Sequence, residues 1–199
     1  MSAPHAAVVL AAGGSARLGR PKQLLTREGE TLVHRAARLA LASGASRVLV
    51  VVGAHAGDIA ACVSDLPVAC VANAHWDEGL AGSVRVAADA LAAHPHATLF
   101  LTCDQPALEL AHLHALREAS HRAPSGSAAT RFGDRVGIPA IIAAPMLRAA
   151  RSLQGDRGLR DVLNAAGVGV IACDAPDLLL DVDTPADLAA AVSRGWIDP

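Results

Sequence analysis

The sequence predicts an α/β protein in which a mostly parallel, mixed sheet lies between two layers of helices. Short apolar runs rich in β-branched residues alternate with Ala- and Leu-rich segments of helical period, at intervals typical of βα units. The chain has 199 residues, which suits a single domain, residues 1–199, with a sizeable core of its own.

The first strand is expected at Ala6–Ala11, because Val8, Val9 and Leu10 favour extended structure. Similar apolar runs predict further strands at Arg47–Val52, Val68–Ala72, Thr98–Thr102, Ser127–Arg131, Gly137–Ile142 and Val168–Ala172. The connection around Phe132–Arg135 is too short for a crossover helix, so we expect one strand of that pair to run antiparallel.

Segments of helical period lie between these strands. They predict helices at Thr31–Ser43, Ala56–Val63, Gly82–Ala93, Glu109–His121, Ala144–Ser152, Leu159–Ala165 and Pro185–Arg194. Ligands of such sheets bind beyond the carboxyl ends of the strands, and site residues are therefore expected at that edge.

Composition excludes several classes of function. The net charge is -2 and aromatic residues make up only 2% of the chain, so we expect no nucleic-acid partner. No stretch approaches a membrane span, and the apolar start lacks the basic residues of a signal peptide, so no membrane partner is expected. The four cysteines lack C-x-x-C spacing, which favours reduced thiols and a cytoplasmic location.

A glycine-rich, cationic loop follows the first strand. Gly13, Gly14 and Gly19 allow backbone shapes that place amide N–H groups around an anion, and Arg17 and Lys22 add positive charge. The spacing departs from G-x-G-x-x-G, and the P-loop spacing is followed by Arg-Pro where Lys and Ser/Thr are required. The loop therefore predicts a phosphate site that is neither a P-loop nor a dinucleotide fingerprint.

Leu10 through Lys22 resembles the signature L-A-A-G-x-S-x-R-[ML]-G-x-x-K of the MobA/MocA-like nucleotidyltransferases at every defined position. The resemblance implies a Rossmann-like three-layer sandwich of the nucleotide-diphospho-sugar transferase type. It also implies that Arg17 and Lys22 are catalytic and that the loop residues binding the nucleotide are Leu10, Ala11, Ala12, Gly13, Gly14 and Ser15. The alternative is an ordinary βα turn with solvent-facing cations.

Asp104 follows the strand at Thr98–Thr102, on the same edge as the loop. A hard cation that bridges protein and nucleotide phosphates needs carboxylate oxygen there. In the resembled family this Asp, in a D-x-P context, holds Mg²⁺, and Gln105 and Pro106 beside it are candidate substrate contacts. The alternative is an Asp that starts a turn and caps the next helix.

A second acidic segment, LLLDVDTPAD, lies near the end of the chain. Thr184, Pro185 and Asp187 are explained as N-cap, first helical residue and capping-box partner. By resemblance to the family's D-x-D-T-P element, Asp183 is the candidate second metal ligand and Asp181 a weaker one. The alternative is that these acids only favour the positive end of a helix.

Two further segments resemble the family. In the first, Asn73, Gly82 and Ser83 would read the base and ribose from the start of a helix; the alternatives are a turn residue for Asn73 and an ordinary cap for Ser83. In the second, Gly137 in a G-x-P strand and Asp156 in a G-D-x-G turn would form the acceptor side, although Ile138 stands where family members often carry a polar residue.

By this resemblance the reaction is attack of an acceptor phosphate on the α-phosphorus of a nucleoside triphosphate, with release of pyrophosphate. Leu10-Ala11-Ala12-Gly13 is similar to the cytidylyl form, because guanylyl enzymes tend to have L-A-G-G there. We therefore expect CTP and molybdenum cofactor as substrates, with an apo-hydroxylase of the xanthine dehydrogenase type as a possible partner. The alternatives are GTP, a sugar- or polyol-phosphate acceptor, and a non-catalytic carrier of the cofactor.

Overall fold

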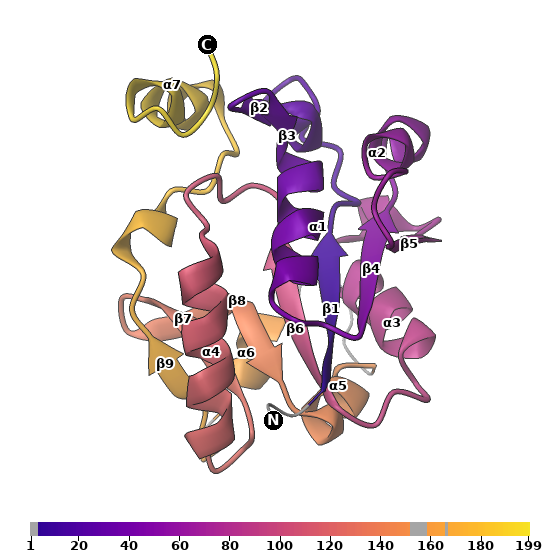
Figure 1. The fold of residues 1–199 in the computed structure, drawn as a ribbon, viewed down its shortest axis with the longest axis vertical. Helices are drawn as coiled ribbons and strands as arrows, with labels where there is room; N and C mark the ends of the chain where they lie inside the picture. The colour runs from indigo at the N-terminus through magenta and orange to yellow at the C-terminus, as the bar shows by residue number, and fades with distance from the viewer. Residues whose placement is uncertain (1–3, 152–158, 166) are drawn as a thin grey trace.

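The structure is a computed structural model that describes residues 4–151, 159–165 and 167–199. Within these residues one sheet has the strand order β5-β4-β1-β6-β8-β7-β9 (Figure 1). Its strands are β1 (His5–Leu10), β4 (Arg47–Val52), β5 (Ala69–Ala72), β6 (Ala97–Thr102), β7 (Ala128–Phe132), β8 (Arg135–Ile142) and β9 (Ile171–Cys173). The short strands β2 (Thr26–Arg27) and β3 (Glu30–Thr31) form a separate antiparallel hairpin.

Strand direction follows the length of the connections. The pairs β1/β4, β1/β6, β4/β5 and β7/β9 are parallel, whereas β8 runs antiparallel to both β6 and β7. Only two residues separate β7 from β8, which leaves no room for a crossover. The predicted α/β class, the mostly parallel mixed sheet and the antiparallel strand are confirmed.

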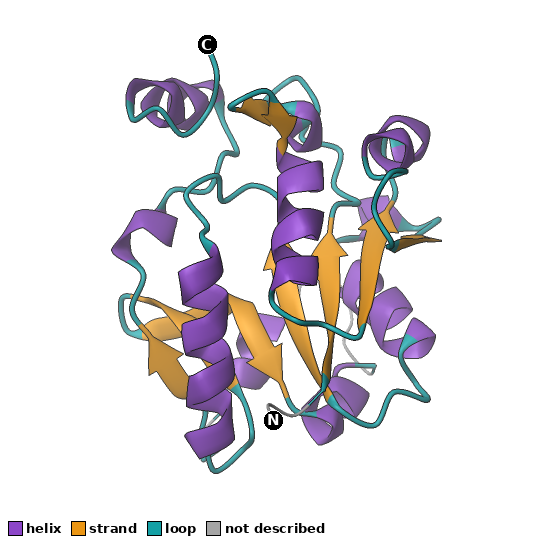
Figure 2. Ribbon diagram, in the orientation of Figure 1, coloured by secondary structure: helices purple, strands orange, loops and turns teal. Residues whose placement is uncertain are grey.

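Helices cover both faces of the sheet (Figures 1 and 2). They are α1 (Leu32–Ala42), α2 (Ala56–Cys62), α3 (Leu80–Ala90), α4 (Leu110–Arg122), α5 (Ala144–Ala150), α6 (Leu159–Leu163) and α7 (Pro185–Ser193), with 3-10 turns η1 (Lys22–Leu24), η2 (Trp76–Glu78) and η3 (Pro176–Leu179). Among the described residues, no helix is long and apolar enough to cross a membrane.

The alternation of side chains along β1 creates two cores. Ala7 and Val9 pack in the cluster that includes residues of α1 and α4, whereas Ala6 and Val8 pack in the cluster that includes residues of α3, α5 and α6. All six residues of β1 are buried, as a central strand covered on both faces requires. The three layers therefore hold the carboxyl end of β1 in a fixed place.

Two expectations about the elements were wrong, and one pair of strands was not predicted. The last strand begins at Ile171 rather than Val168, because Gly167 and Gly169 adopt φ values of 76° and 71° that an extended strand does not allow. Helix α3 begins at Leu80, so Gly82 and Ser83 lie within its first turn and Ser83 is not a cap. The β2/β3 hairpin was missed, since two residues a side give no periodic signal.

Candidate functional site

The loop after β1 is held in shape by Gln23, a residue that sequence reasoning missed. Gln23 is 1% exposed, and its Nε2 donates hydrogen bonds to the carbonyls of Ala11 at 2.9 Å and Gly13 at 2.7 Å. Ser15 accepts a bond from the Lys22 backbone N–H at 3.1 Å. These bonds tie both ends of the loop together, which fixes its backbone without using the cationic side chains.

Trp76 forms one wall of this loop. A Cβ on Gly14 would lie 2.8 Å from the indole of Trp76, and a Cβ on Gly53 would lie 2.5 Å from the Trp76 Cβ. Both positions therefore require glycine for the close approach of the indole, not for an unusual φ. Trp76 is 38% exposed, so part of the ring faces solvent beside the loop.

The strongest polar feature of the site joins three distant segments. The Lys22 Nζ donates to Asp104 Oδ2 at 2.6 Å and to Asp183 Oδ1 at 2.7 Å, while Arg17 Nη2 donates to Asp183 Oδ2 at 2.8 Å. The Val182 backbone N–H donates to the Asp104 carbonyl at 2.9 Å, which brings the C-terminal segment to the end of β6. All four predicted catalytic and metal residues thus lie together at the carboxyl edge of the sheet.

The side chains of Lys22 and Asp104 are only 15% and 16% exposed, so the ion pair is partly desolvated. Burial alone would lower the pKa of Lys22, but the charge and hydrogen bonds of Asp104, and then of Asp183, outweigh it and raise that pKa. Burial would raise the pKa of Asp183, and Lys22 and Arg17 lower it instead. Lys22 and Asp183 are therefore both ionised at neutral pH.

Asp181 lies in the same acidic segment but is held differently. Asp181 is an exposed residue, but its carboxyl is partly desolvated. This desolvation, then repulsion from Asp104 and a smaller repulsion from Asp183, raises the pKa of Asp181 to about 6. Lys22 donates to Asp104 and Asp183. The structure thus singles out Asp183 over Asp181 as the carboxylate that shares a cation with Asp104.

The geometry fits a divalent metal ion. The Lys22 ammonium marks a point at which carboxylate oxygens from two segments converge on one cation, and an all-oxygen donor set suits hard ions such as Mg²⁺. In the described part of the chain, no group of three or more His, Cys, Asp and Glu residues could hold a metal. Asp104 and Asp183 would therefore supply two ligands, with substrate phosphates and water completing the shell.

A cleft of about 500 Å³ opens beside Asp104. Its lining includes Thr102, Gln105 and Asp181 from the acidic edge, and Gly137 and Ile138 from β8. Gln105 is buried and its Nε2 donates to the Ile138 carbonyl at 3.3 Å, which couples the two sides of the cleft. Gly137 thus lines the same cleft as Asp104, and its part in binding an acceptor stays a prediction. Asp156 lies outside the described residues.

Asn73 and Ser83 meet each other instead of lying open to a ligand. Both are buried, Asn73 Nδ2 donates to Ser83 Oγ at 3.1 Å, and Asn73 Oδ1 accepts from the His75 backbone N–H at 3.1 Å. A Cβ on Gly82 would lie 3.2 Å from Asn73 Nδ2, so this glycine makes room for the amide. Their arrangement supports the segment that carries Trp76, and their contact with a nucleotide stays a prediction.

The remaining predicted residues have roles in the local structure. Leu10, Ala11 and Ala12 are buried, whereas Gly13 is exposed at the loop. The Pro106 carbonyl accepts from Arg27 Nη1 at 2.7 Å. Asp104 does not cap α4, whose N-cap is Glu109, but Thr184 and Asp187 do form the predicted capping box of α7.

An open α/β sheet with a glycine-rich, cationic loop after its first strand, and two carboxylates at the same edge, is typical of proteins that bind nucleotides. The MobA-like NTP transferase domain matches residues 7–170, and the chain belongs to this family.

Relatives of known name or structure span nearly the whole chain. A protein named nicotine blue oxidoreductase from Paenarthrobacter nicotinovorans is 36% identical over 89% of this chain and 91% of its own length. The crystal structure of Rv0371c from Mycobacterium tuberculosis H37Rv has a TM-score of 0.79 at 26% identity, covering 96% of this chain and 99% of its own. Rv0371c is also known in complex with manganese.

A nucleotidyl transferase from Methanothermobacter thermautotroptrophicus, Mth528, has a TM-score of 0.80 at 24% identity, covering 96% of this chain and 97% of its own, which supports the fold. The predicted three-layer, nucleotide-diphospho-sugar transferase type of fold is thereby confirmed.

Proposed function

We propose that the protein transfers CMP from CTP to a phosphate of molybdenum cofactor and releases pyrophosphate. The observation that carries this proposal is the Lys22 ammonium held between Asp104 and Asp183, beside the cationic loop. This arrangement suits a reaction that moves large negative charge and needs positioning more than a covalent intermediate. We expect the reaction to take place in the cytoplasm.

In this proposal an oxygen of the acceptor phosphate attacks the α-phosphorus in line. A bond forms between that oxygen and the α-phosphorus, the bond from the α-phosphorus to the bridging oxygen breaks, and pyrophosphate leaves with the electron pair. An acceptor phosphate in its dianionic form needs no proton removed. No general base is therefore required of the chain.

The residues of the chain would bind and orient the two substrates. The loop amides from Gly13 to Ser15, with Arg17 and Lys22, would hold the triphosphate and the charge that develops on pyrophosphate. Asp104 and Asp183 would hold Mg²⁺, which supplies charge neutralisation at the α-phosphate. A manganese complex of the structural relative Rv0371c supports a divalent ion in this fold.

The choice of CTP rests on the Leu10-Ala11-Ala12-Gly13 form of the loop. Ala12 is 4% exposed and its carbonyl accepts from the Ala54 N–H at 3.0 Å, so it holds the loop against the segment after β4. GTP is the first alternative to CTP. A sugar- or polyol-phosphate is the alternative to molybdenum cofactor as acceptor.

The relative named nicotine blue oxidoreductase favours a second candidate function, a redox reaction of nicotine blue or a similar compound. Such a reaction needs an electron donor but has no evident need of two carboxylates that share one cation. Asp104 and Asp183 therefore favour nucleotidyl transfer. The same carboxylates argue against a non-catalytic carrier that would deliver cofactor to an apo-hydroxylase of the xanthine dehydrogenase type.

One set of incubations separates these functions. The purified chain is mixed with Mg²⁺, molybdenum cofactor and each nucleoside triphosphate in turn, and pyrophosphate release is measured. We expect release with CTP. Release with GTP alone would overturn the choice of base, and no release with any triphosphate would overturn the transferase. A change in the redox state of nicotine blue that requires the chain and an added electron donor, tested in parallel, would support the oxidoreductase.

A further inference from the structure

The cleft beside Asp104 contains two arginines to which sequence analysis gave no role. Arg135 is the first residue of β8 and Arg160 lies on α6, and both line the cleft of about 500 Å³. No ion pair joins either guanidinium to a residue in the described part of the chain. The carboxylates of Asp104, Asp161 and Asp181 line the same cleft, and two guanidinium groups that none of them pairs with are suited to an anionic substrate group.

The two arginines are held near each other by Asn164. Its side-chain amide accepts from the Val136 N–H at 2.9 Å and donates to the Val136 carbonyl at 2.8 Å, so α6 is tied to β8 next to Arg135. The same Nδ2 donates to the carbonyl of Arg160 at 2.6 Å. One side chain thus fixes the backbone of both arginine-bearing elements.

Apolar side chains line part of the same cleft, alongside the polar residues Thr102 and Gln105. They come from the start of α3, the end of β7, β8 and α6, and are Leu80, Phe132, Ile138 and Leu159. A Cβ on Gly137 would lie 3.3 Å from the Phe132 ring and 3.9 Å from Arg160 Nε, so the glycine gives both side chains room beside the strand. Asp161 also lines the cleft, on the side of α6.

We propose that Arg135 and Arg160 bind the phosphate of the acceptor, and that the apolar side chains of the cleft favour a phosphomonoester with a flat ring as its body over a polyol phosphate. This inference rests on the proposed nucleotidyl transfer and assigns the acceptor half of that site. Guanidinium pairs bind phosphate oxygens through charge-assisted hydrogen bonds, and they favour the dianion that attacks most readily. The hydroxyls of a polyol would gain no hydrogen-bond partner from the side chains of Phe132 and Ile138.

The test uses the full chain and three probes of defined chemistry: phenyl phosphate, glycerol 3-phosphate and inorganic phosphate, titrated calorimetrically. The variants are Arg135→Met, Arg160→Met and the conservative Arg160→Lys, with Arg148→Met on α5 as a control that removes an exposed cation outside the cleft. CTP affinity is measured in every variant.

We expect phenyl phosphate to bind more tightly than glycerol 3-phosphate or inorganic phosphate. Each Arg→Met variant should weaken phenyl phosphate binding by about tenfold or more, with Arg160→Lys in between and Arg148→Met unchanged. CTP affinity should stay within about twofold throughout. Phenyl phosphate binding that is unchanged in both Arg→Met variants would refute the role of the two arginines. A loss of CTP affinity as large as the loss of phenyl phosphate affinity would also refute it.

Equal affinity for phenyl phosphate and glycerol 3-phosphate would overturn the selection by the apolar side chains of the cleft. Pyrophosphate release by the wild-type chain distinguishes these results from a failure of the proposed function. If no triphosphate is consumed but the arginine variants still bind phenyl phosphate more weakly than the wild type, the phosphomonoester site is supported and the proposed nucleotidyl transfer is wrong. If CTP is consumed and the arginine variants have the same KM for the acceptor as the wild type, nucleotidyl transfer is supported and the role assigned to the two arginines is wrong.

Discussion

The side chain of Trp76 packs directly on the Cα of Gly53, leaving no space for a methyl group between them. A Cβ at position 53 would lie 2.5 Å from the Trp76 Cβ and 2.8 Å from the Ala12 carbonyl oxygen. Because the second contact is with backbone of the loop after β1, the two segments are locked to each other at this glycine. Their relative position is therefore sensitive to the smallest possible substitution.

Gly53→Ala should lower the free energy of unfolding by about 1–3 kcal/mol, because either the indole or the loop must shift. It should also weaken CTP binding and change Trp76 fluorescence, measured in a Trp196→Phe background that leaves a single indole. Gly57→Ala is the matched control, since its Cβ would meet nothing within 4 Å. A Gly53→Ala protein as stable as the control would contradict this packing argument.

Lys22→Met should separate catalysis from metal binding. Loss of the ammonium leaves Asp104 and Asp183 without their shared cation, so Mn²⁺ added without nucleotide should bind more tightly than to the wild type. Transfer should nevertheless fall by about a hundredfold or more, because charge on the triphosphate is no longer neutralised. Calorimetry with Mn²⁺ and a pyrophosphate assay measure the two effects, and weaker Mn²⁺ binding would refute this role of Lys22.

Asp104→Asn should reduce pyrophosphate release by about two orders of magnitude or more, since an amide keeps the shape but loses the charge that a divalent ion needs. Asp183→Asn should act in the same direction. Asp177→Asn in η3 removes an exposed carboxylate away from the cleft and serves as the control. Near-normal turnover of Asp104→Asn would remove this residue from the mechanism.

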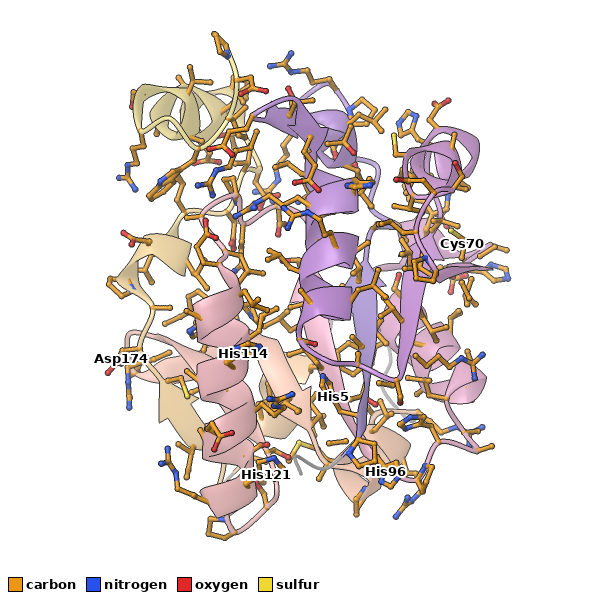
Figure 3. All side chains as sticks on the ribbon, in the orientation of Figure 1. His5, Cys70, His96, His114, His121 and Asp174 are labelled. Atoms are coloured by element: carbon orange, nitrogen blue, oxygen red, sulfur yellow. The ribbon has the colours of Figure 1, made fainter. Side chains whose placement is uncertain are left out.

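His5, at the amino end of β1, should make stability depend on pH (Figure 3). Burial, followed by the charge of Arg117 and nearby histidines, lowers the pKa of His5 from 6.5 to about 4. The unfolded chain therefore binds more protons between these values, and stability is lost as the pH falls from 6.5 toward 4. The loss at pH 4.5 amounts to about 2–3 kcal/mol.

His5→Asn removes this titration. Chemical unfolding at pH 7 and pH 4.5 should show a smaller difference between the two pH values in the variant than in the wild type. An identical difference in both proteins would mean that His5 is not the residue responsible. Its Nε2 lies 3.0 Å from the Ser43 Oγ, and Asn is chosen to keep a polar group near that hydroxyl.

The sequence was most informative where a pattern repeats. Hydrophobic runs such as Arg47–Val52 predicted the sheet because buried parallel strands need apolar side chains on both faces. The sequence was least informative where the backbone conformation of one or two residues sets the start of an element. The positive φ values at Gly167 and Gly169 delay β9, and nothing in an apolar run indicates that in advance.

In the candidate site, too, the sequence indicated residues within motifs but not those that act singly. Lys22, Asp104 and Asp183 were each identified from local motifs, but their mutual contacts depend on tertiary approach over as many as 161 residues. Gln23 was missed because a buried amide that satisfies two backbone carbonyls leaves no spacing signal. Asn164, which ties the elements that carry Arg135 and Arg160, lies outside every motif.

Lys22 and Arg17 together balance the charges of Asp104 and Asp183, so the stability of the fold should not depend on a bound metal ion. Clusters of bare carboxylates often need a bound ion before the surrounding chain is stable. Here the positive charge that balances the carboxylates belongs to side chains of the protein. EDTA should therefore leave the melting temperature unchanged while it abolishes turnover. We therefore expect the stability of this protein to depend on its own cationic side chains, and its activity on a divalent ion.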